Sequence, residues 1–73
     1  MTEKEFDRLE FSIFCIENVA IRLGCNGRDI YLKLKDSNLL ESYIMANYEV
    51  LHTQGKDYIV DDIIDVMKEE TLI

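Results

Sequence analysis

The residues best suited to chemistry are the only histidine, His52, and two cysteines, Cys15 and Cys25. A catalytic or metal-binding histidine needs a nucleophile, co-ligands or a substrate cleft, and one histidine without companions meets none of these criteria. His52 lies at the end of the helical pattern that contains Tyr48. We therefore favour a structural role, in which His52 donates a hydrogen bond to a terminal carbonyl or packs against the tyrosine ring.

The cysteines predict free thiols. Cys15 lies inside a helical pattern and Cys25 just beyond its end, so about 15 Å of helix separates them, whereas a disulfide requires Cα atoms within about 7 Å. Cys25 precedes a second helix, where the dipole lowers a thiol pKa, but the local signatures of cysteine enzymes are absent. We therefore favour a role for Cys25 as a small residue in a tight turn. A small hydrolase that uses Cys25 and His52 is the least favoured of the functions considered, because no substrate is indicated.

The most distinctive pattern is a strip of carboxylates near the C-terminus, here called the acidic strip. Its members are Asp57, Asp61, Asp62, Asp65 and Glu69. Because the spacings are mostly four, like charges are neighbours on one helix face. Each such pair destabilises the helix by about 0.2–0.5 kcal/mol. The strip lacks the pattern of a calcium loop, and a helix exterior offers no cleft for hydrolysis. It is either a solvated face that keeps a small protein soluble or a docking strip for a basic partner.

Length and charge limit the classes of function. Seventy-three residues form one domain, residues 1–73, with a small core. The net charge of −7 disfavours nucleic acid and anionic membranes as partners. The polar start MTEKEF is no signal peptide, and no apolar run approaches the roughly 20 residues that span a bilayer. Phosphate loops, zinc spacings and nucleophile elbows are absent, so we expect a cytoplasmic protein that is not an enzyme and needs no cofactor or metal.

The first element that must position these groups is a helix over residues 3–23. Thr2 and Glu5 form a capping box at its start, and Gly24 is suited to a C-cap with positive φ. Apolar spacings of three and four predict its buried stripe. That stripe consists of Phe6, Leu9, Ile13, Ile16, Ala20 and Leu23. A second apolar set, Phe11, Phe14 and Ile21, lies off the stripe. It predicts either that this helix is central to the fold or that one side is covered by a partner or by a second copy in a homodimer.

Three further helical patterns follow. The second begins at the N-cap Asn26 and ends near Asp36; the third begins at Asn38, where Glu41 completes a capping box, and continues or kinks near Asn47. The last spans residues 56–70. Its apolar side consists of Ile59, Val60, Ile63, Ile64, Val66 and Met67. The sequence therefore predicts an all-α domain, a bundle of four short helices, or five if the third pattern breaks.

Three stretches of the chain carry a family resemblance. They are FSIFCIE at 11–17, with Phe11, Cys15, Ile16 and Glu17; YEVLHT at 48–53; and YIVDDI at 58–63. Through them the chain, from about residue 6 to residue 67, resembles the bacterial family called domain of unknown function 3791.

That resemblance implies a small helical protein without an assigned activity or catalytic residue. Some members are encoded beside a larger protein similar to ADP-ribosyltransferases, which implies an acidic partner of antitoxin or regulatory type. The resemblance also implies that one group of residues ends one helix and aims the next, with the Thr53 hydroxyl capping the last helix or bracing His52. That group is Tyr48, Leu51, His52, Thr53 and Gly55.

Two functions of different classes follow from these patterns. The favoured one is a non-enzymatic acidic domain that binds another protein through the acidic strip or the first helix. The alternative is a helix-turn-helix DNA binder that reads with Arg28, Lys33 and Lys35 of the second helix. Fifteen acidic residues in the chain oppose that alternative.

Overall fold

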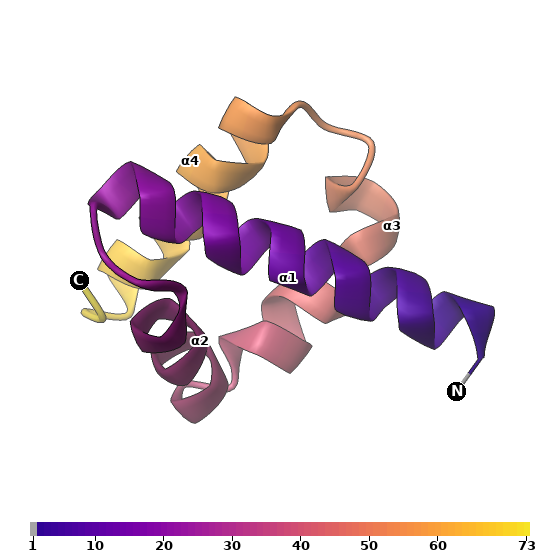
Figure 1. Ribbon diagram of the computed structural model, residues 1–73, viewed down its shortest axis with the longest axis horizontal. Coiled ribbons are helices and arrows are strands. Elements are labelled where there is room, and N and C mark those ends of the chain that lie inside the picture. The colour runs from indigo at the N-terminus through magenta and orange to yellow at the C-terminus, as the bar shows by residue number, and fades with distance from the viewer. Residues whose placement is uncertain (1) are drawn as a thin grey trace.

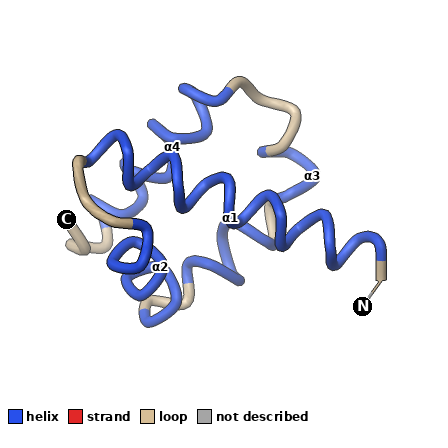
Figure 2. The backbone as a smooth tube through the Cα atoms, in the orientation of Figure 1, coloured by secondary structure: helices blue, strands red, loops and turns tan. Residues whose placement is uncertain are grey.

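Helices make up all the regular structure in residues 2–73, the part of the chain that the computed structural model describes (Figure 2). The elements in order are α1 (Glu3–Leu23), α2 (Gly27–Asp36), the π-helical segment η1 (Leu40–Met45), α3 (Tyr48–Leu51) and α4 (Lys56–Glu69). Helix α1 crosses the molecule and contacts α2, η1 and α4 (Figure 1). The predicted all-α class is confirmed, and the third pattern is broken into η1 and α3.

The predicted caps of the first two helices are present. Thr2 Oγ1 accepts a hydrogen bond from the Glu5 backbone N–H at 3.2 Å, and Asn26 Oδ1 accepts one from the Asp29 N–H at 2.9 Å. Gly24 ends α1 with φ of 70°, and its N–H reaches the last carbonyls of the helix. These bonds satisfy backbone groups that a helix end leaves free, so both helices begin and end where local chemistry predicts.

The predicted capping box at Asn38 is wrong. Asn38 has φ of 68°, and its N–H donates to the Lys35 carbonyl at 3.0 Å at the end of α2. Its carbonyl accepts the Ser42 N–H at 3.0 Å, so the next helical turn still begins at Asn38, but without the predicted side-chain cap. The N-terminus of η1 has no side-chain cap. Asparagine is one of the few residues that enter the left-handed region at low cost. At Asn38 the tendency of asparagine to adopt positive φ prevails over its tendency to cap a helix through its side chain.

The predicted kink near Asn47 is confirmed. The Ala46 N–H donates to the Glu41 carbonyl at 3.1 Å, five residues back, and the Asn47 side-chain amide donates to the Tyr43 carbonyl at 2.7 Å. Side chains that bond nearby backbone compete with regular helix geometry. Helix α3 therefore starts afresh after Asn47, in a new direction (Figure 1).

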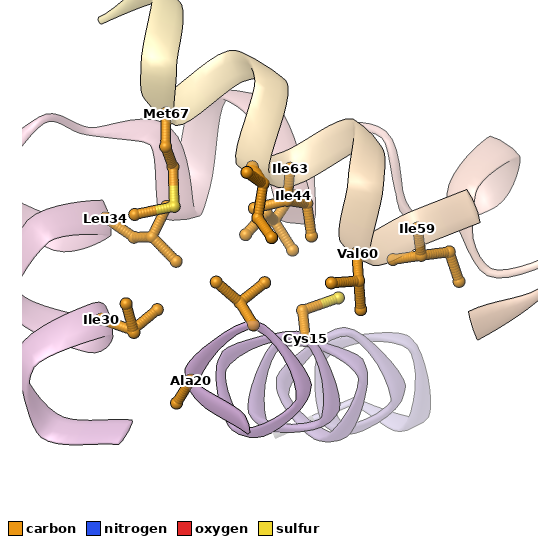
Figure 3. Close-up of a cluster of buried hydrophobic side chains, with 11 residues drawn as sticks. Cys15, Ala20, Ile30, Leu34, Ile44, Ile59, Val60, Ile63 and Met67 are labelled. Atoms are coloured by element: carbon orange, nitrogen blue, oxygen red, sulfur yellow. The ribbon is translucent and has the colours of Figure 1, made fainter. Parts of the chain in front are cut away.

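The core lies between α1, α2 and α4 (Figure 3). Five of the six residues predicted to be apolar-side positions of α4 are buried, and Val66 is half-buried. The buried five are Ile59, Val60, Ile63, Ile64 and Met67. Leu34 and Ile30 of α2 and Cys15 and Val19 of α1 pack in the same cluster. The period-3.6 pattern of α4 therefore predicted its buried face correctly.

Helix α1 buries only the second half of the predicted stripe, where Ala20 is buried and Ile16 and Leu23 are half-buried against the core. Phe6, Leu9 and Ile13 are 51%, 39% and 47% exposed. The buried residues are Ser12, Cys15, Val19 and Ala20. The Ser12 hydroxyl donates to the Arg8 carbonyl at 2.8 Å, so its burial leaves no unpaired hydroxyl. Figure 3 shows Cys15 beside Val60 of α4. The two helices thus meet through small α1 side chains, and the largest apolar residues of its first half remain at the surface.

Candidate functional site

The structure divides the acidic strip among three environments. Arg22 of α1 forms ion pairs with Asp57, at 3.2 Å, and with Asp61. Asp62 accepts a hydrogen bond from the Tyr43 hydroxyl of η1. Within residues 2–73, Asp65 and Glu69 form no ion pair and are exposed. The strip is therefore not one continuous acidic surface, because part of its charge is balanced by Arg22.

Asp62 lines a small polar pocket where η1, α3 and α4 meet. The pocket holds about 170 Å³. Its polar side chains are Tyr43, Asn47, Gln54, Tyr58 and Asp62. The pKa of Tyr43 is raised to about 12, chiefly by burial and then by the hydrogen bond to Asp62 and the charge of that carboxylate. The Tyr43 hydroxyl therefore stays protonated at neutral pH and keeps its proton directed at Asp62.

Both contacts predicted for His52 are present. Its Nδ1 lies 2.7 Å from the Tyr48 carbonyl oxygen, and because a carbonyl only accepts, this nitrogen carries the proton. The ring stacks on Tyr48 with centroids 4.4 Å apart, and the Tyr48 ring meets Phe11 of α1 edge-on at 5.4 Å. Tyr48 therefore connects α3 to α1, and His52 supports the Tyr48 ring from the end of α3.

Thr53 and Gly55 complete the turn that leads to α4. The Thr53 hydroxyl donates to the Val50 carbonyl at 2.7 Å. Gly55 begins α4 without any side-chain cap. The predicted cap from Thr53 to the last helix is therefore wrong, and the hydroxyl instead satisfies a free carbonyl at the end of α3.

The hydrolase interpretation needs Cys25 and His52 close together. The α1–α2 turn, which holds Cys25, and the α3–α4 turn, which holds His52, lie on opposite sides of the molecule (Figure 1). The structure does not bring these two residues together. In residues 2–73 no group of three or more His, Cys, Asp or Glu side chains is placed to hold a metal ion.

The two thiols should differ strongly in reactivity. Both cysteines are free, Cys15 buried and Cys25 exposed, and burial raises the pKa of Cys15 from 9.0 to about 12. Below pH 9 the Cys15 thiolate fraction is then about a thousandfold lower than for an ordinary thiol. We expect a thiol reagent to modify Cys25 quickly in the native protein and Cys15 only after unfolding. Equal rates for the two thiols in the folded protein would contradict this packing.

The basic residues proposed to read DNA are engaged within the chain. Lys33 Nζ donates to the Leu72 carbonyl at 3.0 Å, and Lys35 Nζ lies 5.8 Å from the centre of the Tyr31 ring. A reading helix presents its side chains to the groove. Of the three cations on α2, only Arg28 has no such contact among the described residues.

Large apolar side chains are exposed along α1, on a surface here called the outer face. It consists of Phe6, Leu9, Ile13, Phe14 and Ile21. Of the predicted partner surface, Phe14 and Ile21 are exposed, but Phe11 is half-buried against the core, so the prediction is wrong for Phe11. Prediction from sequence missed Phe6, Leu9 and Ile13 as surface residues. The available signal was the small residue Cys15, whose size suits its place beside Val60 of α4.

Sequence and structure comparisons complete the description of this chain. The model of a family described as "Protein of unknown function (DUF3791)" matches residues 10–70. The comparison with curated proteins found no match, and neither did the comparison with solved structures. No described helix is both long enough and apolar enough to cross a membrane.

Proposed function

The chain belongs to the DUF3791 family of unknown function, and from the geometry of this member we propose that it is a non-enzymatic domain that binds another protein through the outer face of α1. The observation that carries the proposal is the exposure of five large apolar side chains on one helix, between 38% and 76% each. Single exposed hydrophobic residues are ordinary, whereas several large ones gathered on one helix surface indicate an interaction site. A regulatory partner of antitoxin type is the form of this function that the family resemblance supports.

The charge on α1 indicates what kind of partner fits. Successive residues advance about 100° around an α-helix, so Glu10 and Glu17 lie between the Leu9–Ile13 and Phe14–Ile21 parts of the outer face. A second copy would bring these carboxylates together in one interface, and like charges there oppose association. The surface instead fits a different protein, with an apolar stripe flanked by lysine or arginine.

Replacing Leu9 with glutamate should release that partner. Leu9 of α1 and Leu32 of α2 are each 39% exposed in a helix, so Leu32→Glu is a matched control with the same change in charge. We expect a tagged wild-type chain to capture one partner from its host cell, and Leu9→Glu to weaken that capture at least about tenfold, because a charge replaces an apolar contact. The readout is the partner retained on the resin per amount of tagged chain.

Three outcomes would overturn the proposal. Equal capture by the wild type and Leu9→Glu would remove the outer face as the docking site. Loss with Leu32→Glu alone would move the site to α2. Absence of any captured protein, together with a homodimer in sedimentation that Leu9→Glu dissolves, would assign the surface to a second copy of the chain.

A further inference from the structure

We propose that the polar pocket formed by η1, α3 and α4 binds the guanidinium group of an arginine side chain from the protein partner. This inference rests on the proposed function and names a second contact of the same complex. Val50 and Leu51 line part of the pocket, and its polar lining consists of Tyr43, Asn47, Gln54, Tyr58 and Asp62. It shares none of these residues with the outer face of α1.

Three side chains of the pocket already donate one hydrogen bond each within the chain. The Tyr43 hydroxyl donates to Asp62 Oδ2, the Asn47 amide donates to the Tyr43 carbonyl at 2.7 Å, and the Gln54 amide approaches Thr53 Oγ1 at 3.5 Å. Within residues 2–73, no hydrogen bond reaches the acceptors Asp62 Oδ1, Asn47 Oδ1 or Gln54 Oε1. The Tyr58 hydroxyl and the second N–H of each amide also have no such bond among the described residues. The free charged acceptor, Asp62 Oδ1, therefore favours a cationic ligand that donates hydrogen bonds.

Arginine matches that requirement. A guanidinium carries five N–H donors and no acceptor, and its planar fork pairs with a carboxylate through two parallel bonds. Asp62 is half-buried and forms no ion pair with the described residues. The Tyr58 ring lines the same pocket and can contribute a cation–π contact, which arginine makes more often than lysine does.

The volume of the pocket also limits the ligand. About 170 Å³ is below the roughly 300–1,000 Å³ of pockets that enclose whole small molecules, so it suits one side-chain head group. Pockets near the centre of an interface that receive an arginine are typical binding hot spots. The chain's net charge of −7 would further favour the approach of a basic partner.

The test is an NMR titration of the intact chain with N-acetyl-arginine methylamide. We expect saturable shifts of the Tyr43, Tyr58 and Asp62 resonances, and none with the neutral citrulline analogue. Asp62→Asn should weaken binding about tenfold by removing a charged hydrogen-bond acceptor. Asp65→Asn is the matched control, since it makes the same change on the exposed side of α4, and it should leave binding unchanged. Exposed Tyr58→Leu gives a second variant with little risk to folding, and it should also weaken binding.

Four results would overturn the inference: no saturable shift, equal binding of citrulline, equal binding of the lysine analogue, or equal losses in the Asp62 and Asp65 variants. The probe is a small molecule, so this titration is independent of partner capture. A failed titration with Leu9-dependent capture would remove only the pocket. A positive titration without Leu9-dependent capture would remove the outer face and leave the pocket.

Discussion

Replacing Ile63 with alanine is expected to unfold most of the protein. Ile63 lies in the middle of α4, is 1% exposed, and points into the cluster between α1 and α2 (Figure 3). Truncating a buried isoleucine to alanine costs about 2–5 kcal/mol in the free energy of unfolding. A domain of this size has only about 3–5 kcal/mol in total. The loss is therefore comparable to the whole stability of the fold.

The matched control is Ile21→Ala, the same substitution at a helical site that is 76% exposed. It should change the free energy of unfolding by less than about 0.5 kcal/mol. Urea titrations followed by circular dichroism give both values. If Ile63→Ala were as stable as Ile21→Ala, the packing of α4 described above would be incorrect. If Ile21→Ala were as damaging as Ile63→Ala, Ile21 would be covered in solution.

Replacing Gly24 with alanine should lower the free energy of unfolding by about 1–2 kcal/mol. Gly24 has φ of 70°, and a side chain in the left-handed region meets its own backbone at about that cost. A Cβ atom at Gly24 would meet no other heavy atom within 4 Å. The expected loss is therefore backbone strain alone, without steric conflict from packing.

Gly55 supplies the matched control for that variant. A Cβ atom there also meets nothing within 4 Å, but φ is −71°, which any residue adopts. In Gly55→Ala, alanine makes the unfolded chain less flexible, which stabilises the folded state. Alanine is also a poorer N-cap residue than glycine, which destabilises the start of α4. We expect a net change within about 0.5 kcal/mol of zero. Equal losses at Gly24 and Gly55 in the same urea titrations would show that φ is not the cause.

Local chemistry predicted the helix ends better than it predicted which side of α1 is buried. Thr2, Gly24 and Asn26 cap the helices as expected, because a cap depends on residues only a few positions away. Asn38 went wrong because asparagine both caps helices and adopts positive φ. Which of the two conformations Asn38 adopts depends on where α2 ends relative to the core.

The buried face of α1 depended on another helix. Its large apolar residues gave a regular stripe, but the small residues Ser12 and Cys15 are buried, and Cys15 is the one that lies beside Val60 of α4. The distance between two packed helices depends on the side chains at their contact, so small residues can be selected there. A pattern built only from large apolar residues therefore does not show which small residues lie at a contact between helices.

The polar pocket had no signal in the sequence. Tyr43 and Asp62 are 19 residues apart and come together only because η1 and α4 meet. Arg22 likewise reaches Asp57 and Asp61 across the contact of α1 with α4. Periodicity predicted an acidic strip on α4, but long-range pairing decides which of its carboxylates remain free.

The central claim, that the outer face of α1 docks a protein partner, is tested most directly by site-specific photo-crosslinking in the host cell. A photoreactive residue placed at Leu9 or at Leu32 samples two helices with the same exposure. We predict one covalent adduct of a single partner from position 9 and none from position 32. An adduct of the same partner from position 32 and none from position 9 would contradict the claim.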